Sequence, residues 1–274
     1  MKAGFFQFEV LHKDKDKNLK KVAERLMEED FDFIVLPELF TCGYYFDTKD
    51  EIRSFAEVIP DGETTQLLIK IAKKKNAFIV GGLAEISKNT FYNTVVVVGP
   101  NGYIGKHRKV HLPNLEKRIF TPGHSFEIFN CGNTKIGIIT CFDYTFPEAS
   151  RILALKGAQI LCNPSSSGNM RSHILQTRAY ENKVYVITAN RLGIERTEFC
   201  KTTFTGESQI INYNGAVLNY VKNDESVGVC EIIPEEARKK NIIGDNDIFE
   251  EIAIYKSGLK DENDADNKSV SADK

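Results

Sequence analysis

The sequence predicts an α/β protein in which a mixed sheet, or two sheets packed together, is covered by helices on the outside. Three observations lead to this fold class. Short apolar runs typical of strands alternate with segments that carry an apolar stripe at helical spacing. Two hairpin signals, at residues 99–102 and at Asn214-Gly215, add antiparallel pairs. The 42% hydrophobic and 27% charged content is ordinary for a globular protein, so a chain of 274 residues can build a sizeable core.

The first third of the chain alternates between strand and helix signals. Residues 3–10 are apolar and predict a strand, and an apolar stripe at residues 18–29 predicts a helix. The short apolar run at residues 32–39 predicts a buried strand. A second helical stripe at residues 64–76 leads into another apolar run at residues 77–85. This order is typical of β-α-β units in which helices cover a sheet.

The remaining elements combine hairpins with the same alternation. Residues 91–98 and 102–109 flank the turn sequence GPNG and predict the first hairpin. The elements after it are strands at 135–140, 159–164, 184–190 and 227–233, helices at 147–158 and 173–183, and a second hairpin over 207–221. Pro147 falls in the first turn of its helix, where the missing N–H costs nothing.

We expect one domain over residues 1–257, because no linker composition divides the chain. Residues 258–274 contain almost no large apolar residue and predict a disordered tail. The preceding stretch, residues 246–255 (NDIFEEIAIY), is apolar enough to dock on its own domain or on a partner subunit.

The charge balance and the apolar runs exclude several classes of partner. Lys and Arg total 36 against 38 Asp and Glu, which argues against a nucleic-acid binder. No apolar run approaches the roughly 20 residues of a membrane span, and the first residues lack the pattern of a signal peptide. We therefore expect a cytoplasmic protein that binds neither nucleic acid nor membrane.

The cysteines and histidines do not predict a metal site. The six cysteines are scattered and form no C-x-x-C pair, so most of them are expected to be small buried apolar residues. His107 and His111 are four residues apart, but they lie in a basic segment without a nearby acidic or cysteine partner.

Three reactive side chains follow predicted strands at their carboxyl ends, where α/β sheets form their binding crevices. Glu38 follows FIVLP, Lys109 follows GYIGKHR, and Cys141 follows KIGIIT. A fourth, Glu116, lies in a predicted loop seven residues after Lys109. The positions predict that these side chains meet at one site.

The chemistry of these residue types fits covalent catalysis. Cys141 precedes a helix start, whose N–H groups and dipole would stabilise a thiolate, so we expect its pKa to be the lowest of the six cysteines. Glu38 can act as the base if it is buried. Lys109 and the backbone N–H of Phe142 would stabilise an anionic tetrahedral intermediate.

Each residue also fits an ordinary structural role when taken alone. Glu38 could cap the short segment after Pro37, and Lys109 could belong to a solvated basic face. Glu116 would normally lie in a surface loop, and Asp143 would normally cap the helix that begins near Pro147. Asn163-Pro164 would normally form a turn after a strand. Only the combination favours catalysis.

The segments LPELF, HRKVHLP and CFDYTFPEASR, in this order, resemble the three signature segments of the nitrilase superfamily of carbon–nitrogen hydrolases. The resemblance covers nearly the whole chain, from GFFQFEV to NDIFEEI, and is closest to the small amidase and nitrilase-like members of prokaryotes. Each of the three segments carries one of the reactive residues.

This resemblance implies a four-layer α-β-β-α sandwich with a Glu-Lys-Cys triad. It makes Glu38 the general base, Lys109 the oxyanion stabiliser and Cys141 the nucleophile, and it matches Glu116 to a glutamate that positions substrate. The implied reaction passes through a thioester, releases ammonia or an amine, and needs no metal or organic cofactor. The implied assembly is a homodimer or a higher homo-oligomer.

The substrate is predicted from residues around Cys141. Tyr144 and Thr145 stand where D-amino-acid carbamoylases of this superfamily carry two arginines, which argues against a carbamoyl-amino-acid substrate. Aromatic residues could line a pocket for a small acyl group, or could equally be core packing; they are Tyr44, Tyr45, Tyr144 and Phe146. Asn163 lies at the base of a candidate pocket loop that also carries Arg171.

An amidase that acts on a small linear amide is the first functional hypothesis. A nitrilase that acts on small aliphatic nitriles would use the same residues, and an N-carbamoyl-amine amidohydrolase is a further alternative. A catalytically silent scaffold of the same fold would have no need for Glu38, Lys109 and Cys141 together. An acyltransferase is disfavoured, since such relatives usually carry membrane spans or extra domains.

Overall fold

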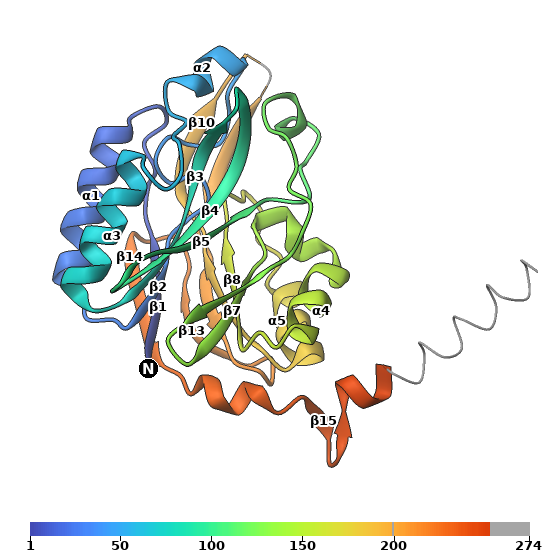
Figure 1. The fold of residues 1–274 in the computed structure, drawn as a ribbon. Coiled ribbons are helices and arrows are strands. Elements are labelled where there is room, and N and C mark those ends of the chain that lie inside the picture. Colours follow the sequence, from blue (N-terminus) through green and yellow to red (C-terminus); the bar gives the residue numbers. More distant parts are fainter. Residues whose placement is uncertain (199, 253–274) are drawn as a thin grey trace, which may run out of the picture.

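The computed structural model describes residues 1–198 and 200–252, and two six-stranded sheets packed face to face form its centre (Figure 1). The strand order of the first sheet is β14 (Ser226–Glu231), β1 (Lys2–Gln7), β2 (Phe33–Val35), β3 (Phe78–Ser87), β4 (Thr90–Gly99) and β5 (Gly102–Arg108). Strands β1, β2 and β3 are parallel, whereas β14, β4 and β5 join by antiparallel pairing.

The second sheet repeats this arrangement of a parallel centre with antiparallel edges. Its strand order is β13 (Val217–Val221), β12 (Ser208–Ile211), β9 (Tyr185–Ala189), β8 (Ile160–Pro164), β7 (Thr134–Ile138) and β6 (Ile128–Cys131). Strands β7, β8 and β9 are parallel, and the other pairs are antiparallel.

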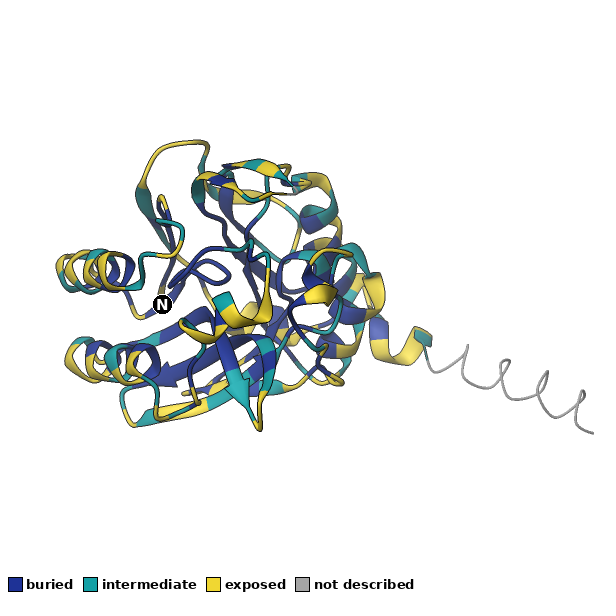
Figure 2. Cartoon of the chain, turned by 90° about the horizontal axis from the view of Figure 1, so that it is seen from above, coloured by how far each residue is buried: buried dark blue, intermediate teal, exposed yellow. Residues whose placement is uncertain are grey.

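Helices cover the outer face of each sheet. The first sheet is covered by α1 (Lys15–Glu28) and α3 (Glu63–Lys75), whose buried residues share an apolar cluster with outward-facing residues of β1 to β4. The second sheet is covered in the same way by α4 (Pro147–Leu155) and α5 (Ser172–Asn182). Seen from above, the buried segments lie between the two helix layers (Figure 2). The predicted α-β-β-α sandwich is confirmed.

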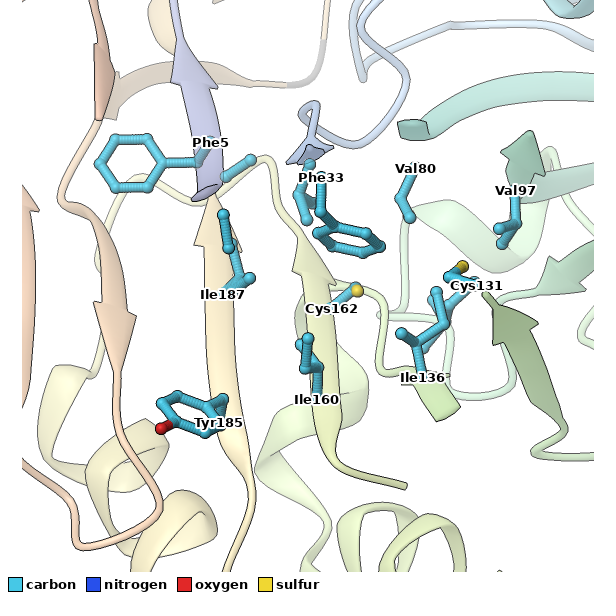
Figure 3. Close-up of a cluster of buried hydrophobic side chains, with 14 of the residues drawn as sticks. Phe5, Phe33, Val80, Val97, Cys131, Ile136, Ile160, Cys162, Tyr185 and Ile187 are labelled. Atoms are coloured by element: carbon cyan, nitrogen blue, oxygen red, sulfur yellow. The ribbon is translucent and has the colours of Figure 1, made fainter. Parts of the chain in front are cut away.

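The core between the sheets follows from the alternation of side chains along each strand. Phe33, Val80 and Val97 point from the first sheet toward the second, and Ile136, Ile160, Cys162 and Ile187 point back (Figure 3). Phe5 belongs to the same cluster. The neighbours Phe6 and Ile34 belong instead to the cluster under α1 and α3. Both faces of the central strands are therefore apolar, as the uninterrupted runs of the sequence indicate.

The structure corrects several boundaries of the predicted elements. Strand β2 is only three residues long, because Pro37 has no N–H with which to continue the ladder, and the chain leaves the sheet just before Glu38. The sequence analysis missed several short elements whose patterns are weak: α2 (Lys49–Arg53), β6, and the pair β10 (Leu192–Arg196) and β11 (Lys201–Thr205).

The C-terminal part of the described chain leaves the sandwich. After the 3-10 helix η3 (Pro234–Arg238), the small hairpin of β15 (Asn241–Ile243) and β16 (Asn246–Asp247) extends away from the body (Figure 1). The predicted tail at 258–274 lies outside the described residues, and the single domain over 1–257 stays a prediction. No helix in residues 1–198 or 200–252 is long and apolar enough to cross a membrane.

Candidate active site

Lys109 lies at the centre of a buried charged cluster that also contains Glu38 and Glu116. Its Nζ donates to Glu38 Oε1 at 2.7 Å and to Glu116 Oε2 at 2.6 Å, and all three side chains are 0–1% exposed. Strands β2 and β5 point the same way in the first sheet, so their carboxyl ends deliver Glu38 and Lys109 to the same edge. The structure therefore brings together the residues that the strand ends predicted, and Lys109 does not lie on a solvated face.

The charge of Lys109 is maintained by its two carboxylate partners. Burial by itself disfavours an ammonium, but Glu116 and Glu38 raise the pKa of Lys109 above its ordinary value. An ammonium carries three N–H donors, and these two glutamates occupy two of them. One N–H remains for a further acceptor.

The two oxygens of Glu38 have different environments. Oε1 accepts from Lys109 and, at 2.7 Å, from Asn93 Nδ2, whereas Oε2 is buried and has no hydrogen-bond partner among the described residues. Burial raises the pKa of Glu38, Lys109 lowers it and Glu116 raises it, with a net rise. A carboxylate with a raised pKa and one bare oxygen can accept a proton near neutral pH.

Glu116 differs from Glu38 in that both of its oxygens are occupied. It lies in the 3-10 helix η1 (Glu116–Arg118), where Oε1 accepts from Asn93 at 2.7 Å and Oε2 accepts from Tyr44 Oη at 2.6 Å as well as from Lys109. Three donors to one carboxylate, one of them the Lys109 ammonium, hold it in place beside Lys109. Glu116 is therefore suited to hold Lys109 charged, and it is not part of a solvated loop.

Cys141 begins the five-residue 3-10 helix η2 (Cys141–Thr145), after the short link of Ile139 and Thr140 that follows β7, with a positive φ of 45°. A non-glycine residue is strained in this conformation, which persists only where its surroundings enforce it. Around Cys141, the Asp143 carboxylate accepts from Thr140 N at 3.0 Å, which closes a capping box over the turn. The turn therefore fixes the place of the sulfur.

The expected low pKa of Cys141 is wrong for this structure. Burial raises the pKa of the Cys141 thiol, the Glu38 carboxylate raises it further, and Lys109 lowers it only in part, so the net shift is upward. A five-residue 3-10 helix provides little dipole to oppose burial. These effects favour the neutral thiol beside the Glu38 carboxylate.

Asp143 joins the Cys141 turn to the segment that carries Lys109. Its Oδ1 accepts from His111 N at 2.9 Å and contacts His111 Nδ1 at 2.8 Å, and its Oδ2 lies 3.6 Å from His107 Nε2. The sequence analysis missed this contact, because the histidines precede Asp143 by more than thirty residues. The pKa of Asp143 is about 2, since its interactions with His107 and His111 outweigh the effect of burial.

We expect Asp143→Asn to lower the free energy of unfolding by about 2 kcal/mol at pH 7, since an amide cannot replace the charged acceptor. A carboxylate with a lowered pKa stabilises the fold above its unfolded pKa, near 4, and loses this contribution as the pH falls toward 2. The difference between wild type and variant should therefore shrink between pH 5 and pH 3. Urea unfolding at several pH values measures it, and a constant difference would contradict the assignment.

A small pocket adjoins the charged cluster and shares Tyr44 and Glu116 with it. Its other lining residues are Tyr45, Phe46, Asp47, Leu115, Arg118, Ile119, Phe120, Thr197 and Cys200. The Tyr44 and Tyr45 rings are 4.9 Å apart, edge to face, and Lys109 Nζ lies 5.5 Å from the Tyr44 ring centre. Two of the predicted aromatic residues, Tyr44 and Tyr45, thus line a pocket beside Lys109.

The other predicted substrate contacts have mixed environments. Asn163 is fully buried at the end of β8, where its amide contacts Thr188 and Ser165, and Tyr144 belongs to the apolar cluster under α4 and α5. The Phe142 ring packs edge to face with Phe146, at 5.4 Å between ring centres. The roles of Phe142, Tyr144 and Asn163 toward substrate stay predictions.

A second buried ion pair supports the pocket and was not foreseen. Glu195 of β10 and Arg191 are both fully buried and hydrogen-bonded to each other. The Glu195 carboxylate also accepts from the backbone N–H groups of Tyr44, at 3.0 Å, and of Tyr45, at 2.8 Å. Gly43 has a φ of +90°, and a Cβ there would lie 2.5 Å from Glu195 Oε1. The backbone of the loop that carries Tyr44 is thus held by the buried Glu195 carboxylate.

The described residues contain no cluster of three or more His, Cys, Asp or Glu side chains that could hold a metal ion. The side chains of the site offer a thiol, a carboxylate with a bare oxygen, and an ammonium with one N–H that neither glutamate accepts.

Comparison with known proteins gives a consistent result. Residues 2–239 match the family model described as carbon-nitrogen hydrolase. The chain is 41% identical to a protein named nitrilase from Pyrococcus abyssi, over 92% of this chain and 97% of that one. It is 33% identical to the omega-amidase NIT2-B of Xenopus laevis, over 80% and 83%. A solved carbon-nitrogen hydrolase from Helicobacter pylori matches the fold with a TM-score of 0.79 at 26% identity, over 86% and 90%.

Proposed function

The chain belongs to the carbon-nitrogen hydrolase family, and on that premise we propose that it hydrolyses a small linear amide through a thioester on Cys141. Glu38 is the general base, Lys109 stabilises the oxyanion, and Glu116 keeps Lys109 charged. The observation that carries this proposal is the asymmetry of Glu38. Oε1 of Glu38 accepts two hydrogen bonds, whereas its buried Oε2 has no partner. The charge of the Glu38 carboxylate also raises the pKa of the Cys141 thiol.

Acylation begins when the Cys141 thiol gives its proton to Glu38 Oε2 while its sulfur attacks the amide carbon. The carbonyl oxygen becomes an oxyanion, which receives the remaining N–H of Lys109 and the backbone N–H of Phe142. When the intermediate collapses, the C–N bond breaks and the protonated Glu38 gives its proton to the leaving nitrogen. Ammonia or an amine departs, and the acyl group stays on sulfur.

Deacylation uses the same groups in reverse order. Glu38 takes a proton from a water molecule, and the resulting nucleophile attacks the thioester carbon. Lys109 again holds the oxyanion. The C–S bond breaks, the sulfur regains the proton from Glu38, and a carboxylic acid leaves. Because Lys109 keeps its charge throughout, its role requires the ionised Glu116 beside it.

The pocket beside Lys109 favours a short acyl group with a partly apolar body. Tyr44, Tyr45 and Phe120 contribute aromatic side chains to its lining, and its charged residues are Asp47, Glu116 and Arg118. A nitrilase is the second candidate, because the 41% identical relative carries that name, whereas the 33% identical relative is named an omega-amidase.

We propose that the protein acts in the cytoplasm as a homodimer in which the C-terminal hairpin contributes to the contact. The hairpin leaves the sandwich, and Ile243 at its tip is 74% exposed (Figure 1). Sedimentation of the full chain and of a chain ended at residue 239 tests this, since loss of the hairpin should yield a monomer.

The test of the proposed activity is release of ammonia from a panel of small aliphatic amides, N-carbamoyl compounds and aliphatic nitriles. We expect the amides to be hydrolysed fastest, and mass spectrometry of the quenched reaction to find the acyl group on Cys141. Faster turnover of nitriles would select the second candidate. An acyl group on another residue, or hydrolysis without any adduct on Cys141, would contradict the assigned nucleophile.

Glu38→Gln should lower kcat by about 10²–10⁴-fold, because glutamine keeps the shape of the carboxylate but cannot accept the thiol proton. The pH dependence should change as well. In the wild type, kcat/KM should rise as the raised pKa of Glu38 is passed, since the base must be ionised, and this limb should be missing in the variant. Glu85→Gln is the control, because Glu85 is equally buried and pairs with Arg108 and Lys106 on the other face of the sheet. If kcat/KM of Glu38→Gln still rises with pH as in the wild type, the general base must be another group.

A further inference from the structure

Asn93 of β4 contacts all three members of the charged cluster. Its Nδ2 donates to Glu38 Oε1 and to Glu116 Oε1, both at 2.7 Å, and its backbone carbonyl accepts from Lys109 N at 2.8 Å. The residue is 1% exposed, so water does not compete for these bonds. No other uncharged side chain among the described residues hydrogen-bonds to both glutamates.

These contacts orient the Glu38 carboxylate. Lys109 and Asn93 both donate to Oε1 of Glu38, so rotation of the carboxylate would break two charge-assisted hydrogen bonds. The consequence is that Oε2, the oxygen without a donor, stays available. An oxygen already occupied by two donors would be a poorer proton acceptor.

An amide is the residue type that this position requires. Its single nitrogen carries two N–H groups and can bridge two carboxylates without adding charge. A hydroxyl has only one proton to donate, and an aspartate would add a third carboxylate beside the one ammonium of Lys109. Leucine has nearly the same shape but no donor.

We infer that Asn93 is a positioning residue. It determines which oxygen of Glu38 receives the Cys141 proton, and how readily that oxygen accepts the proton. This inference rests on the proposed role of Glu38 as the base. Asn93 acts through Glu38 and Glu116 and need not touch the substrate.

The groups that face Glu38 come from separate elements, and each affects its protonation. Burial raises the pKa of Glu38, Lys109 at the end of β5 lowers it, Glu116 in η1 raises it, and the Asn93 N–H lowers it. Cys141 faces it from η2. Removing the Asn93 donor should therefore raise the pKa of Glu38 and move the acid limb of kcat/KM to higher pH.

The test is a carboxyl titration by NMR of the full-length protein labelled with ¹³C in the glutamate carboxyl groups, with Glu38 assigned from Glu38→Gln. We expect the Glu38 midpoint in Asn93→Leu to rise by roughly one to two pH units, as loss of a hydrogen bond to a charged group implies. We expect kcat at pH 7 to fall by about 10²-fold, because the base is then misaligned and a larger fraction of it is protonated. Asn93→Ser keeps one donor and should give smaller changes in both quantities.

Thr94→Val is the matched control. Thr94 is the next residue on β4, fully buried, and donates to Glu85 Oε2 at 2.7 Å on the opposite face. The Thr94→Val variant should be less stable than wild type, but its Glu38 should keep the wild-type titration midpoint. An unmoved midpoint with wild-type kcat in a folded Asn93→Leu or Asn93→Ser variant would overturn the inference and leave Asn93 only as support for the Lys109 backbone. Failure of the proposed function is distinguishable, because it would show as no turnover by wild type while the titration stays readable.

Discussion

Cys141→Ala should abolish turnover, with kcat lowered by about 10⁴-fold or more, because no other group in the site can form the covalent intermediate. The loss should fall on kcat, since Cys141 forms its bond only during the reaction. Substrate should still bind, with an affinity close to that of wild type. Measurement of product in single-turnover conditions, together with calorimetric binding of the substrate, separates the two quantities.

The fold should survive this substitution. Cys141 is small and buried, so alanine removes only one sulfur atom, and the capping box between Thr140 and Asp143 stays in place. The control is Cys230→Ala, a half-buried cysteine of β14 outside the site, which should keep wild-type activity. Appreciable hydrolysis by a pure Cys141→Ala protein would rule out the thioester pathway, because water would then be attacking the amide directly.

Lys109→Met should combine a loss of activity with a loss of stability. Removal of the oxyanion donor lowers kcat by about 10²–10³-fold. The free energy of unfolding should fall by about 3–5 kcal/mol, because two buried carboxylates lose their only ammonium. Kinetics on the best substrate and urea unfolding followed by circular dichroism measure these two effects.

The stability loss should depend on pH with a defined sign. Without Lys109, burial and the repulsion of Glu116 raise the pKa of Glu38 in the folded state further above that of the unfolded chain. A carboxyl with a raised folded pKa favours folding at low pH and loses this contribution as the pH rises. Lys109→Met should therefore be closer to wild type at pH 5 than at pH 8.

Two further variants test the interpretation. Lys106→Met removes a lysine of the same strand whose partner, Glu85, keeps Arg108, and it should cost at most about 1 kcal/mol with full activity. If Lys109→Met fails to fold, Lys109→Met with Glu116→Gln removes one of the unpaired charges and should restore folding but not activity. Restored activity in that double variant would contradict the oxyanion role of Lys109.

Some elements of the fold could be predicted from the sequence, whereas others could not. Long periodic segments such as α1 and α3 lie within three residues of their predicted ranges, because an amphipathic stripe is a local property. Strands β10 and β11 were missed, since they are short, largely polar and form a separate two-stranded sheet. The Glu195 side chain on β10 lies under the Tyr44 loop, about 150 residues away along the chain, and no local pattern reveals such a contact.

The residue types of the site and their order at strand ends can be read from the sequence, because a strand's carboxyl end is marked by local hydrophobicity. The sequence does not reveal their electrostatic state. The Cys141 thiol was expected to have a low pKa from the adjacent helix start, yet burial beside Glu38 raises it. Likewise, Asp143 was expected to cap a helix, and it also binds two histidines from β5 and the segment that follows.

The three-dimensional packing is needed to show which oxygen of Glu38 is bare, which donors hold Glu116, and that Asn93 bridges the two carboxylates. These properties depend on atoms brought within 3 Å from five separate segments, and on the exclusion of water around them. The packing of the two sheets sets the burial of these groups and the direction of their hydrogen bonds, whereas the identity and order of the reactive residues follow from the sequence alone.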